Sequence, residues 1–347
     1  MPKHVLLLKP RVRRVLRFMR GLEQAVAPRF HAFVIALCWL VAKAMTYSII
    51  GRDPLTGEIG IAVQSRFFAV GRIVPWIEAA VGAVASQGFS DPAYGFRGLE
   101  LLSQGATPQD ALETIKRADA GAAMRQVAML DARGRVAVFT GQGCVAAAGH
   151  MIGDNCVAQA NMMARESVWT AMVSAFQQSG GALADRLLAA LTAAQKEGGD
   201  IRGTQAAALV VSAPTTTGHA ALDRLVDLRV DDHTYPIGEI ARLLAYGRAH
   251  QRANAATDNA TAGDLLGALA DLDASCSGYP REPEFLCRRA GVLLALGRID
   301  EAREMIARAC DIGAGWGEWM LRLADAGIIP VGRRQLQSLI PSALREA

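Results

Sequence analysis

The sequence predicts an α+β fold in which a four-layer αββα sandwich is followed by a small helical C-terminal domain. Two observations predict it. Short apolar segments typical of strands occur in three blocks, and a pair of helix-like segments separates each block from the next, which suits two central sheets covered by helices. Apolar residues make up 51% of the chain and charged residues 20%, a balance that supports a large core and excludes a disordered chain.

The first 45 residues form a basic leader. They contain nine Lys or Arg residues and one acid, whereas the rest of the chain contains 28 basic and 32 acidic residues. A basic region, an apolar stretch over 30–42 and the spacing Ala42-Lys43-Ala44 are typical of an export signal. The alternative interpretation is that residues 1–45 reflect a mis-set start, that translation begins at Met45, and that the protein is cytoplasmic. A third alternative is that the leader is retained.

The body is expected to begin with strands. Residues 47–51 and 59–65 are apolar and strand-like, and Asp53 to Gly57 supplies a turn sequence between them. A third apolar strand is expected over 81–86, after a loop that contains Pro75.

Helix pairs and further strands follow in alternation. The first pair is expected over 94–104 and 107–119, where Thr107 is the N-cap and Pro108 occupies the first helical position. The later elements, in chain order, are a hairpin of 125–130 and 136–140, strands near 147–151 and 157–161, helices over about 164–178 and 182–197, and strands over 207–212 and 224–230.

A polar segment sets the predicted domain boundaries. Residues 247–262 are poor in bulky apolar side chains and are interpreted as a linker, which places the sandwich at 46–246 and a helical domain at 263–347. Residues 293–302 resemble the helix–Gly–turn–helix centre of a tetratricopeptide-like hairpin. A single such unit cannot bury its own face, so we expect it to pack on the main domain, on a partner or on a second copy of the chain as a homo-oligomer.

Composition and motifs exclude several functions. The body is mildly acidic, and no basic run is interleaved with aromatic residues, which argues against a nucleic-acid partner. The sequence has no phosphate-binding loop, dinucleotide fingerprint or zinc-like spacing, so neither a cofactor nor a metal is expected. Asp231-Asp232-His233 follows a strand and is interpreted as a solvated loop, and the six scattered cysteines are interpreted as small core residues.

Thr46 is a candidate nucleophile because of its position. It heads the first strand and would become the N-terminal residue if the chain began at Met45 and that methionine were removed. A threonine hydroxyl needs a base, and a free α-amine, with a pKa of about 7.7–8.0, is a suitable one. With any residue before Thr46 the amine is an amide and accepts no proton. The alternative interpretation is an ordinary β-branched strand residue.

The body resembles domain-of-unknown-function family 1028, which is placed with the N-terminal-nucleophile hydrolase-like folds. The matching stretches, within about 46–235, are Met45-Thr46-Tyr47-Ser48-Ile49 with Arg52-Asp53-Pro54, Ala62 to Gly71, Val74-Pro75-Trp76, Gly82 to Gln87, Ala93-Tyr94-Gly95, Gln159 to Met163 and Gly198 to Gln205. Ala206 departs from the pattern, which would have Ser. Family members commonly begin at the Met-Thr equivalent, and some carry a C-terminal extension assigned to peptidoglycan binding, which residues 260–335 resemble.

The resemblance implies a hydrolase-like site. The leading hypothesis is an amidohydrolase acting on a small or peptide-like amide: Thr46 attacks the carbonyl, its α-amine moves the proton, and water releases the acyl-enzyme. The rival hypothesis is a non-catalytic αββα scaffold that binds a ligand or a cell-wall fragment, with the helical tail making protein contacts.

The other candidate site residues each have a second interpretation. Gln87 and Asn161 end apolar strands and would either donate hydrogen bonds to the oxyanion or tie loops together. Arg66 would bind a substrate carboxylate or form a surface ion pair. Asp200 and Arg202 lie in a Gly-rich loop, and we expect them to pair with each other and hold that loop near Thr46 more than to act directly in binding or catalysis.

Overall fold

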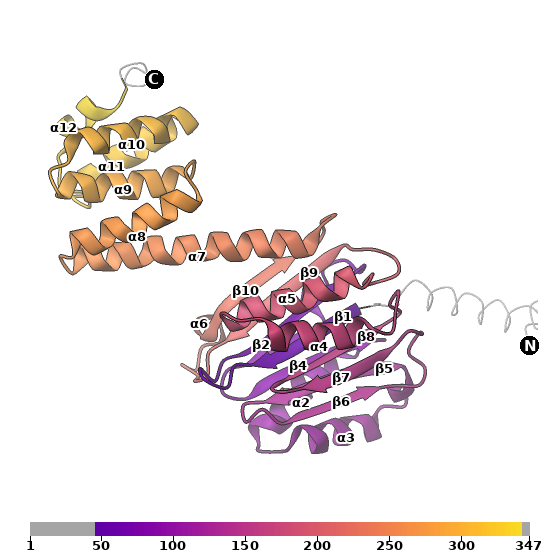
Figure 1. Cartoon of the computed structure of the whole chain (residues 1–347). Coiled ribbons are helices and arrows are strands. Elements are labelled where there is room, and N and C mark those ends of the chain that lie inside the picture. Colours follow the sequence, from indigo (N-terminus) through magenta and orange to yellow (C-terminus); the bar gives the residue numbers. More distant parts are fainter. Residues whose placement is uncertain (1–45, 342–347) are drawn as a thin grey trace, which may run out of the picture. The chain divides into compact units, whose positions relative to one another are not determined.

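The computed structural model describes residues 46–341, so the hypotheses about the leader concern residues outside the described part of the chain. The chain divides into two compact units, one ending at Ile240 and the other beginning at Ala241. Both sheets lie in the first unit, and helices make up the second (Figure 1). The predicted mixture of helices and strands followed by a helical C-terminal region is confirmed.

The larger sheet has six antiparallel strands in the order β10-β9-β2-β1-β8-β7. These strands are β1 (Thr46–Arg52), β2 (Ile59–Ser65), β7 (Gly149–Gly153), β8 (Cys156–Asn161), β9 (Ala206–Ser212) and β10 (Arg224–Val230). Thr46 pairs with Ser65 of β2 on one side and with Asn161 of β8 on the other. The start of β1 and the ends of β2 and β8 therefore lie together at one end of the sheet.

The smaller sheet has four antiparallel strands in the order β3-β4-β5-β6. They are β3 (Pro75–Glu78), β4 (Gly82–Gly88), β5 (Arg125–Asp131) and β6 (Val136–Thr140). The prediction of a loop around Pro75 is wrong, because this residue begins β3. Proline is compatible with that position because β3 is an edge strand, where one side of the backbone needs no ladder hydrogen bond.

A pair of helices covers each sheet. α4 (Val168–Gln178) and α5 (Leu183–Lys196) pack on the larger sheet, and α2 (Pro92–Ser103) and α3 (Pro108–Ala118) pack on the smaller one (Figure 1). The two sheets contact each other, β1 and β2 against β4, and β8 against β5. Three short helical turns lie in connections: η2 (Val70–Arg72), η3 (Ala122–Met124) and α6 (Ala220–Asp223).

The side chains of β1 alternate between two cores. Ile50 is buried in the cluster between the sheets, together with Ala85 of β4 and Leu130 of β5. Gly51 faces α4, since a Cβ at this position would lie only 2.5 Å from the ring of Phe176. Successive side chains of a strand point to opposite faces, so Thr46 shares with Ile50 the face that looks toward the smaller sheet.

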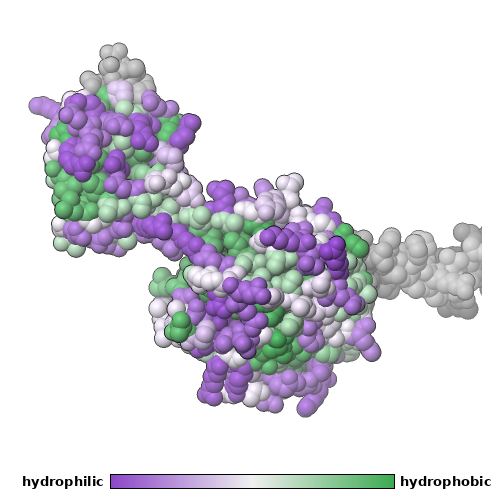
Figure 2. All heavy atoms as spheres, viewed as in Figure 1, coloured by the Kyte–Doolittle hydropathy of each residue, from purple (hydrophilic) through white to green (hydrophobic). Residues whose placement is uncertain are grey.

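The outer strands of the larger sheet limit unwanted pairing in different ways. β10 carries Arg224, Asp227 and Arg229 on its partly exposed length. β7 is only five residues long and has Gly at both ends, but it exposes Met151 and Ile152 by 38% and 52%. Figure 2 shows hydrophobic residues among hydrophilic ones on the visible face of the first unit. Charges and short length both make an edge a poor template for another strand.

Helix α3 begins as the sequence predicts and ends at an ion pair. The hydroxyl of Thr107 accepts a hydrogen bond from the N–H of Asp110 at 3.1 Å. At the other end, Asp119 accepts hydrogen bonds from Arg125 Nε at 2.8 Å, Gly121 N–H at 2.8 Å and the Tyr94 hydroxyl at 3.1 Å. The hydrogen bond from Arg125 is the main reason that the pKa of Asp119 lies below its ordinary value.

We expect Asp119→Asn to reduce the free energy of unfolding by about 1–3 kcal/mol at pH 7, because the charged hydrogen bond is lost. The pKa of Asp119 is lower in the folded chain than in the unfolded chain, where it is about 3.9. Its contribution is therefore complete above the unfolded pKa and is lost as the pH falls through the folded pKa. Hydrogen exchange of β5 amides, measured in urea at pH 7 and at pH 3, should show the unfolding free energies of wild type and variant converging in acid. A difference of the same size at both pH values would contradict this prediction.

The interpretation of residues 247–262 as a linker is wrong, because residues up to Thr261 belong to helix α7 (Pro236–Thr261). Ala249, Ala253 and Ala256 are buried in the hydrophobic cluster of the second unit. Spacings of four and three residues place them on one face of the helix. The lack of bulky apolar side chains, which suggested a linker, instead lets α7 pack closely against its neighbours.

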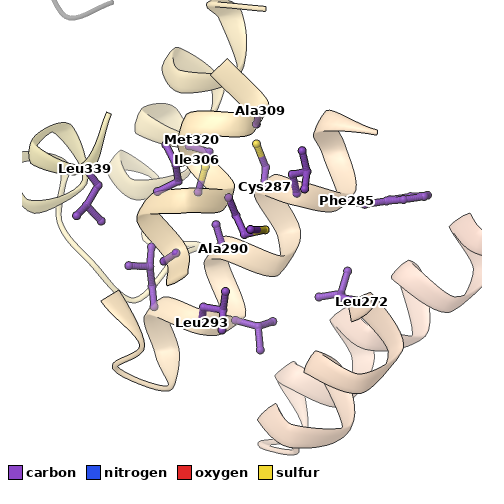
Figure 3. Packing of buried hydrophobic residues seen from close by; sticks show 14 of the residues in the cluster. Leu272, Phe285, Cys287, Ala290, Leu293, Ile306, Ala309, Met320 and Leu339 are labelled. Atoms are coloured by element: carbon purple, nitrogen blue, oxygen red, sulfur yellow. The ribbon is translucent and has the colours of Figure 1, made fainter. Parts of the chain in front are cut away.

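The second unit is built around one hydrophobic cluster. Figure 3 shows Leu272, Phe285, Leu293, Ile306 and Met320 among the side chains that form it. The contributing helices after α7 are α8 (Leu265–Gly278), α9 (Pro283–Ala295), α10 (Ile299–Ile312), α11 (Gly315–Asp325) and α12 (Arg333–Leu339).

The helix–turn–helix predicted over 293–302 is present between α9 and α10. Gly297 makes the turn with φ of 73°, a conformation that favours glycine. Within residues 46–341, no helix combines the length and the apolar character needed to span a membrane.

Candidate functional site

Thr46 lies at the end of the larger sheet where β1 faces the smaller sheet. Its side chain is completely buried in the full chain. Among the described residues its hydroxyl has one hydrogen-bond partner, the Ser65 hydroxyl, to which it donates at 3.2 Å. The Thr46 hydroxyl thus lies beside a second hydroxyl, and no charged side chain of residues 46–341 is hydrogen-bonded to it.

Gln87 and Asn161 converge on the backbone of Thr46, one from each sheet. Gln87 Nε2 donates to the Thr46 carbonyl oxygen at 3.0 Å, and Asn161 Nδ2 approaches the same oxygen at 3.5 Å. Gln87 Oε1 accepts a hydrogen bond from the Ser48 hydroxyl at 2.7 Å, which fixes the orientation of the Gln87 amide. The structure thus brings Thr46, Gln87 and Asn161 together.

Two further glutamines complete this buried polar network, and the sequence analysis missed both. Gln126 of β5 accepts hydrogen bonds from Gln87 and Asn161, and Gln159 of β8 donates to the Ala85 carbonyl at 3.0 Å. Both are fully buried. A signal was available, since each is a neutral amide inside an otherwise apolar strand, where a polar side chain must find partners.

The Gly-rich loop after α5 is held against the end of β2 by Asp200. Its buried carboxylate accepts hydrogen bonds from the Arg66 N–H at 3.0 Å and from Arg202 Nη2 at 2.8 Å and Nε at 3.1 Å. The pairing expected between Asp200 and Arg202 is present. The guanidinium of Arg66 is exposed and donates to Gln205 Oε1 at 2.5 Å, whereas its backbone N–H donates to Asp200.

Burial raises the pKa of the cysteine thiols in the described part of the chain. Burial raises the pKa of Cys156 to about 11 and that of Cys287 to about 12, so both thiols are protonated at neutral pH. Cys156, Cys287 and Cys310 are buried, as expected for core residues, and Cys144 and Cys276 are half-buried. Within residues 46–341, no group of three or more His, Cys, Asp or Glu is placed to hold a metal ion.

Tyr47 and Gln64 lie on the opposite face of the sheet, toward the helices. The Tyr47 hydroxyl donates to Gln195 Oε1 of α5 at 3.0 Å. Burial, and secondly the negative charge of Asp200, raise the pKa of Tyr47 well above its ordinary value, so the phenol stays neutral. Gln64 pairs with Tyr47 in the ladder, is fully buried, and has no hydrogen-bond partner for either amide atom in the described part of the chain.

We expect Gln64→Met to raise the free energy of unfolding of the first unit by about 1–3 kcal/mol. An unsatisfied buried amide costs about this much, and methionine fills a similar volume without polar atoms. Urea dependence of hydrogen exchange in β1 and β2 measures the effect. A destabilised variant would show that Gln64 has partners that compensate its burial.

The first unit is thus a pair of facing antiparallel sheets, each covered by two helices, with the first residue of the central strand buried at their common end. The chain belongs to the family of unknown function DUF1028, whose model matches residues 46–240. It is similar to the protein SPO2555 from Silicibacter pomeroyi, whose crystal structure is assigned to the same family. The two share 35% identity over 58% of this chain and 88% of that chain, with a TM-score of 0.53. No curated protein matches this chain.

Proposed function

We propose that the first unit is an amidohydrolase of the N-terminal-nucleophile type, in which Thr46 is the nucleophile and its own α-amine is the base. The observation that carries the proposal is the set of groups around Thr46, whose hydroxyl is hydrogen-bonded to Ser65 and whose carbonyl oxygen faces the neutral amides of Gln87 and Asn161. None of these side chains takes a proton at neutral pH. The α-amine of Thr46 does so once it is the first residue.

The arrangement of the layers supports the same proposal. We propose that the helix pair, smaller sheet, larger sheet and second helix pair, which contact one another in that order, form a four-layer αββα sandwich, the fold expected for hydrolases of this type. In such a sandwich the end of a central strand can present its first residue to a substrate that enters between the sheets.

The proposed reaction forms and breaks one acyl bond on Thr46. Oγ1 attacks the amide carbonyl carbon, the α-amine takes the hydroxyl proton and passes it to the departing amine, and water then hydrolyses the ester. Gln87 and Asn161 are the proposed oxyanion donors. Their NH₂ groups are occupied by the Thr46 carbonyl and by Gln126, so one of these hydrogen bonds must be exchanged for one to the substrate.

The rim near Thr46 suits a substrate with a carboxylate and an apolar group. Arg66 precedes Phe67 and Phe68, and Phe68 is 62% exposed; Ile201, between Asp200 and Arg202, is 66% exposed. We propose that Arg66 binds the carboxylate of a small or peptide-like amide, since a guanidinium matches a carboxylate with two parallel hydrogen bonds. Asp200 and Arg202 are proposed to hold the loop that forms this rim.

The second candidate is a non-catalytic scaffold that binds a ligand, such as a cell-wall fragment. The complete burial of Thr46 in the full chain favours it, because a substrate cannot reach a hydroxyl that has no exposed surface. A cavity of about 440 Å³ in the second unit, lined by Leu272, Val292 and Trp319 among others, is large enough for a small ligand.

A chain that begins at Met45 separates these candidates. We expect it to fold, to lose its initiator methionine, and to present Thr46 as its first residue, in keeping with a mis-set start and a cytoplasmic protein. Intact mass and amino-terminal sequencing identify the first residue, and hydrogen exchange of the β1 amides shows whether the chain is folded. Aggregation of this chain, while the full chain folds, would show that residues 1–45 are structural; retention of Met45 would leave the amine blocked and favour the scaffold.

A further inference from the structure

Gln126 is held in one orientation by three acceptors on one side of its amide. Nε2 donates to the Ala160 carbonyl at 2.9 Å, to the Thr140 hydroxyl at 3.0 Å and to the Gly149 carbonyl at 3.1 Å. A flipped amide would place its oxygen against two carbonyl oxygens, which repel it. The nitrogen must therefore face β6, β7 and β8, and the oxygen must face the other way.

The oxygen of Gln126 is the shared acceptor of the two amides nearest Thr46. Gln87 Nε2 donates to it at 2.8 Å and Asn161 Nδ2 at 2.9 Å. The same two nitrogen atoms face the Thr46 carbonyl oxygen. Gln126 itself makes no hydrogen bond to Thr46 among those of the described residues, so any effect on Thr46 passes through Gln87 and Asn161.

We propose that Gln126 is a positioning residue for Thr46, which it orients by fixing the amides of Gln87 and Asn161. The inference rests on the proposed function for its catalytic consequence, but the ordering of the two amides stands on the geometry alone. Without Gln126 Oε1, the Asn161 amide loses its closest acceptor and is free to flip, and the Gln87 amide is held by Ser48 and the Thr46 carbonyl without its shortest acceptor. A flip puts a carbonyl oxygen against the Thr46 carbonyl and displaces the start of β1. A displacement of about 1 Å at a nucleophile costs about 100-fold in rate.

The first measurement tests the ordering in the full chain and needs no substrate. Side-chain amide NMR signals of Gln87 and Asn161 are followed by hydrogen exchange in the wild type, Gln126→Met, Gln126→Glu and Gln64→Met. We expect exchange at least ten times faster in Gln126→Met, near-normal exchange in Gln126→Glu, which keeps an acceptor oxygen, and no change in Gln64→Met. The last variant is a matched control, because it removes a buried glutamine from the other face of the sheet.

The second measurement tests the consequence for Thr46. A chain beginning at Thr46 is treated with a β-lactone at pH 6, and acylation of Thr46 is followed by intact mass. We expect the rate to fall about 100-fold in Gln126→Met, to be largely restored in Gln126→Glu, whose buried carboxyl is neutral at this pH, and to be unchanged in Gln64→Met. If Gln126→Met does not fold, Thr140→Val replaces it, since this variant removes one of the acceptors that orient Gln126.

The outcomes distinguish the two proposals. Unchanged exchange of the Gln87 and Asn161 amides in Gln126→Met overturns the positioning role, whatever Thr46 does. Faster exchange with an unchanged acylation rate also overturns it. Faster exchange in a protein whose wild type is never acylated supports the ordering by Gln126 and overturns the nucleophile role of Thr46.

Discussion

Thr46→Ala, in a chain whose first residue is otherwise Thr46, is expected to lose amide cleavage by about four to six powers of ten. The variant keeps the α-amine and loses the hydroxyl, so no acyl-enzyme forms. Removal of a nucleophile from a site that acts as a unit commonly costs this much, and each power of ten corresponds to about 1.4 kcal/mol of barrier. Thr46→Ser keeps both groups and should retain measurable activity.

The matched control for Thr46→Ala is a chain that keeps the threonine but carries one glycine before it. Its hydroxyl is intact while its amine is an amide, so turnover should again vanish with the fold preserved. In the wild type the rate should rise with pH as the amine loses its proton, with a midpoint of about 7–8. The cation of Arg66 at this end of the sheet would move it lower, because a nearby positive charge disfavours the ammonium form, whereas the charge of Arg202 is offset by Asp200.

The measurement uses a panel of amides, with and without a carboxylate, and covalent labelling of Thr46 read by intact mass. Faster cleavage of the amides that carry a carboxylate would agree with the role proposed for Arg66. Cleavage by Thr46→Ala at the wild-type rate would place the nucleophile elsewhere and end the proposed mechanism.

Strands were predictable from the sequence where the pattern of apolar residues directly reflects which faces of the strand are buried. Residues 47–51 and 207–212 are buried and, apart from Ser48 and Ser212, apolar, because β1 and β9 are covered by a sheet on one side and by helices on the other. Pro75 was missed because its effect depends on whether the strand lies at an edge. The alanines of α7 were misjudged because small side chains are equally compatible with a linker and with close helix packing.

The candidate site was predictable only in part, since hydrogen bonds between distant strands leave little trace in sequence. The start of β1 and the end of β8 can be expected to meet once their pairing is known, so the proximity of Thr46 and Asn161 was predictable. The buried amide of Gln126 was a signal that this residue needs partners, but its role could not be predicted, because it lies in a shared acceptor oxygen whose partners are 39 and 35 residues away. The pairing of Asp200 and Arg202 was predictable, because two opposite charges only two residues apart in a Gly-rich loop are a local signal.

Asp200→Ala is expected to lower the free energy of unfolding of the first unit by about 2–4 kcal/mol. The carboxylate is buried and accepts hydrogen bonds from two backbone N–H groups, those of Arg66 and Arg202, as well as from the Arg202 guanidinium. Removing it takes a charged acceptor away from these donors, which is costly for buried groups. The side chain of Arg202 is 30% exposed, so water compensates part of the loss and keeps it below that of a fully buried pair.

Asp227→Ala is the matched control, since Asp227 also pairs with two arginines, Arg224 and Arg229, but on the exposed edge strand β10. Exposed pairs contribute little, so we expect a loss of less than about 1 kcal/mol. Hydrogen exchange of the β2 and β9 amides in urea measures the stability of the first unit in both variants. Tryptophan fluorescence would also report on the second unit, which contains tryptophans. The proposal for the loop also requires slower acylation of Thr46 in Asp200→Ala than in Asp227→Ala. Equal losses of stability in the two variants would show that Asp200 acts as a surface charge and does not anchor the rim beside Thr46.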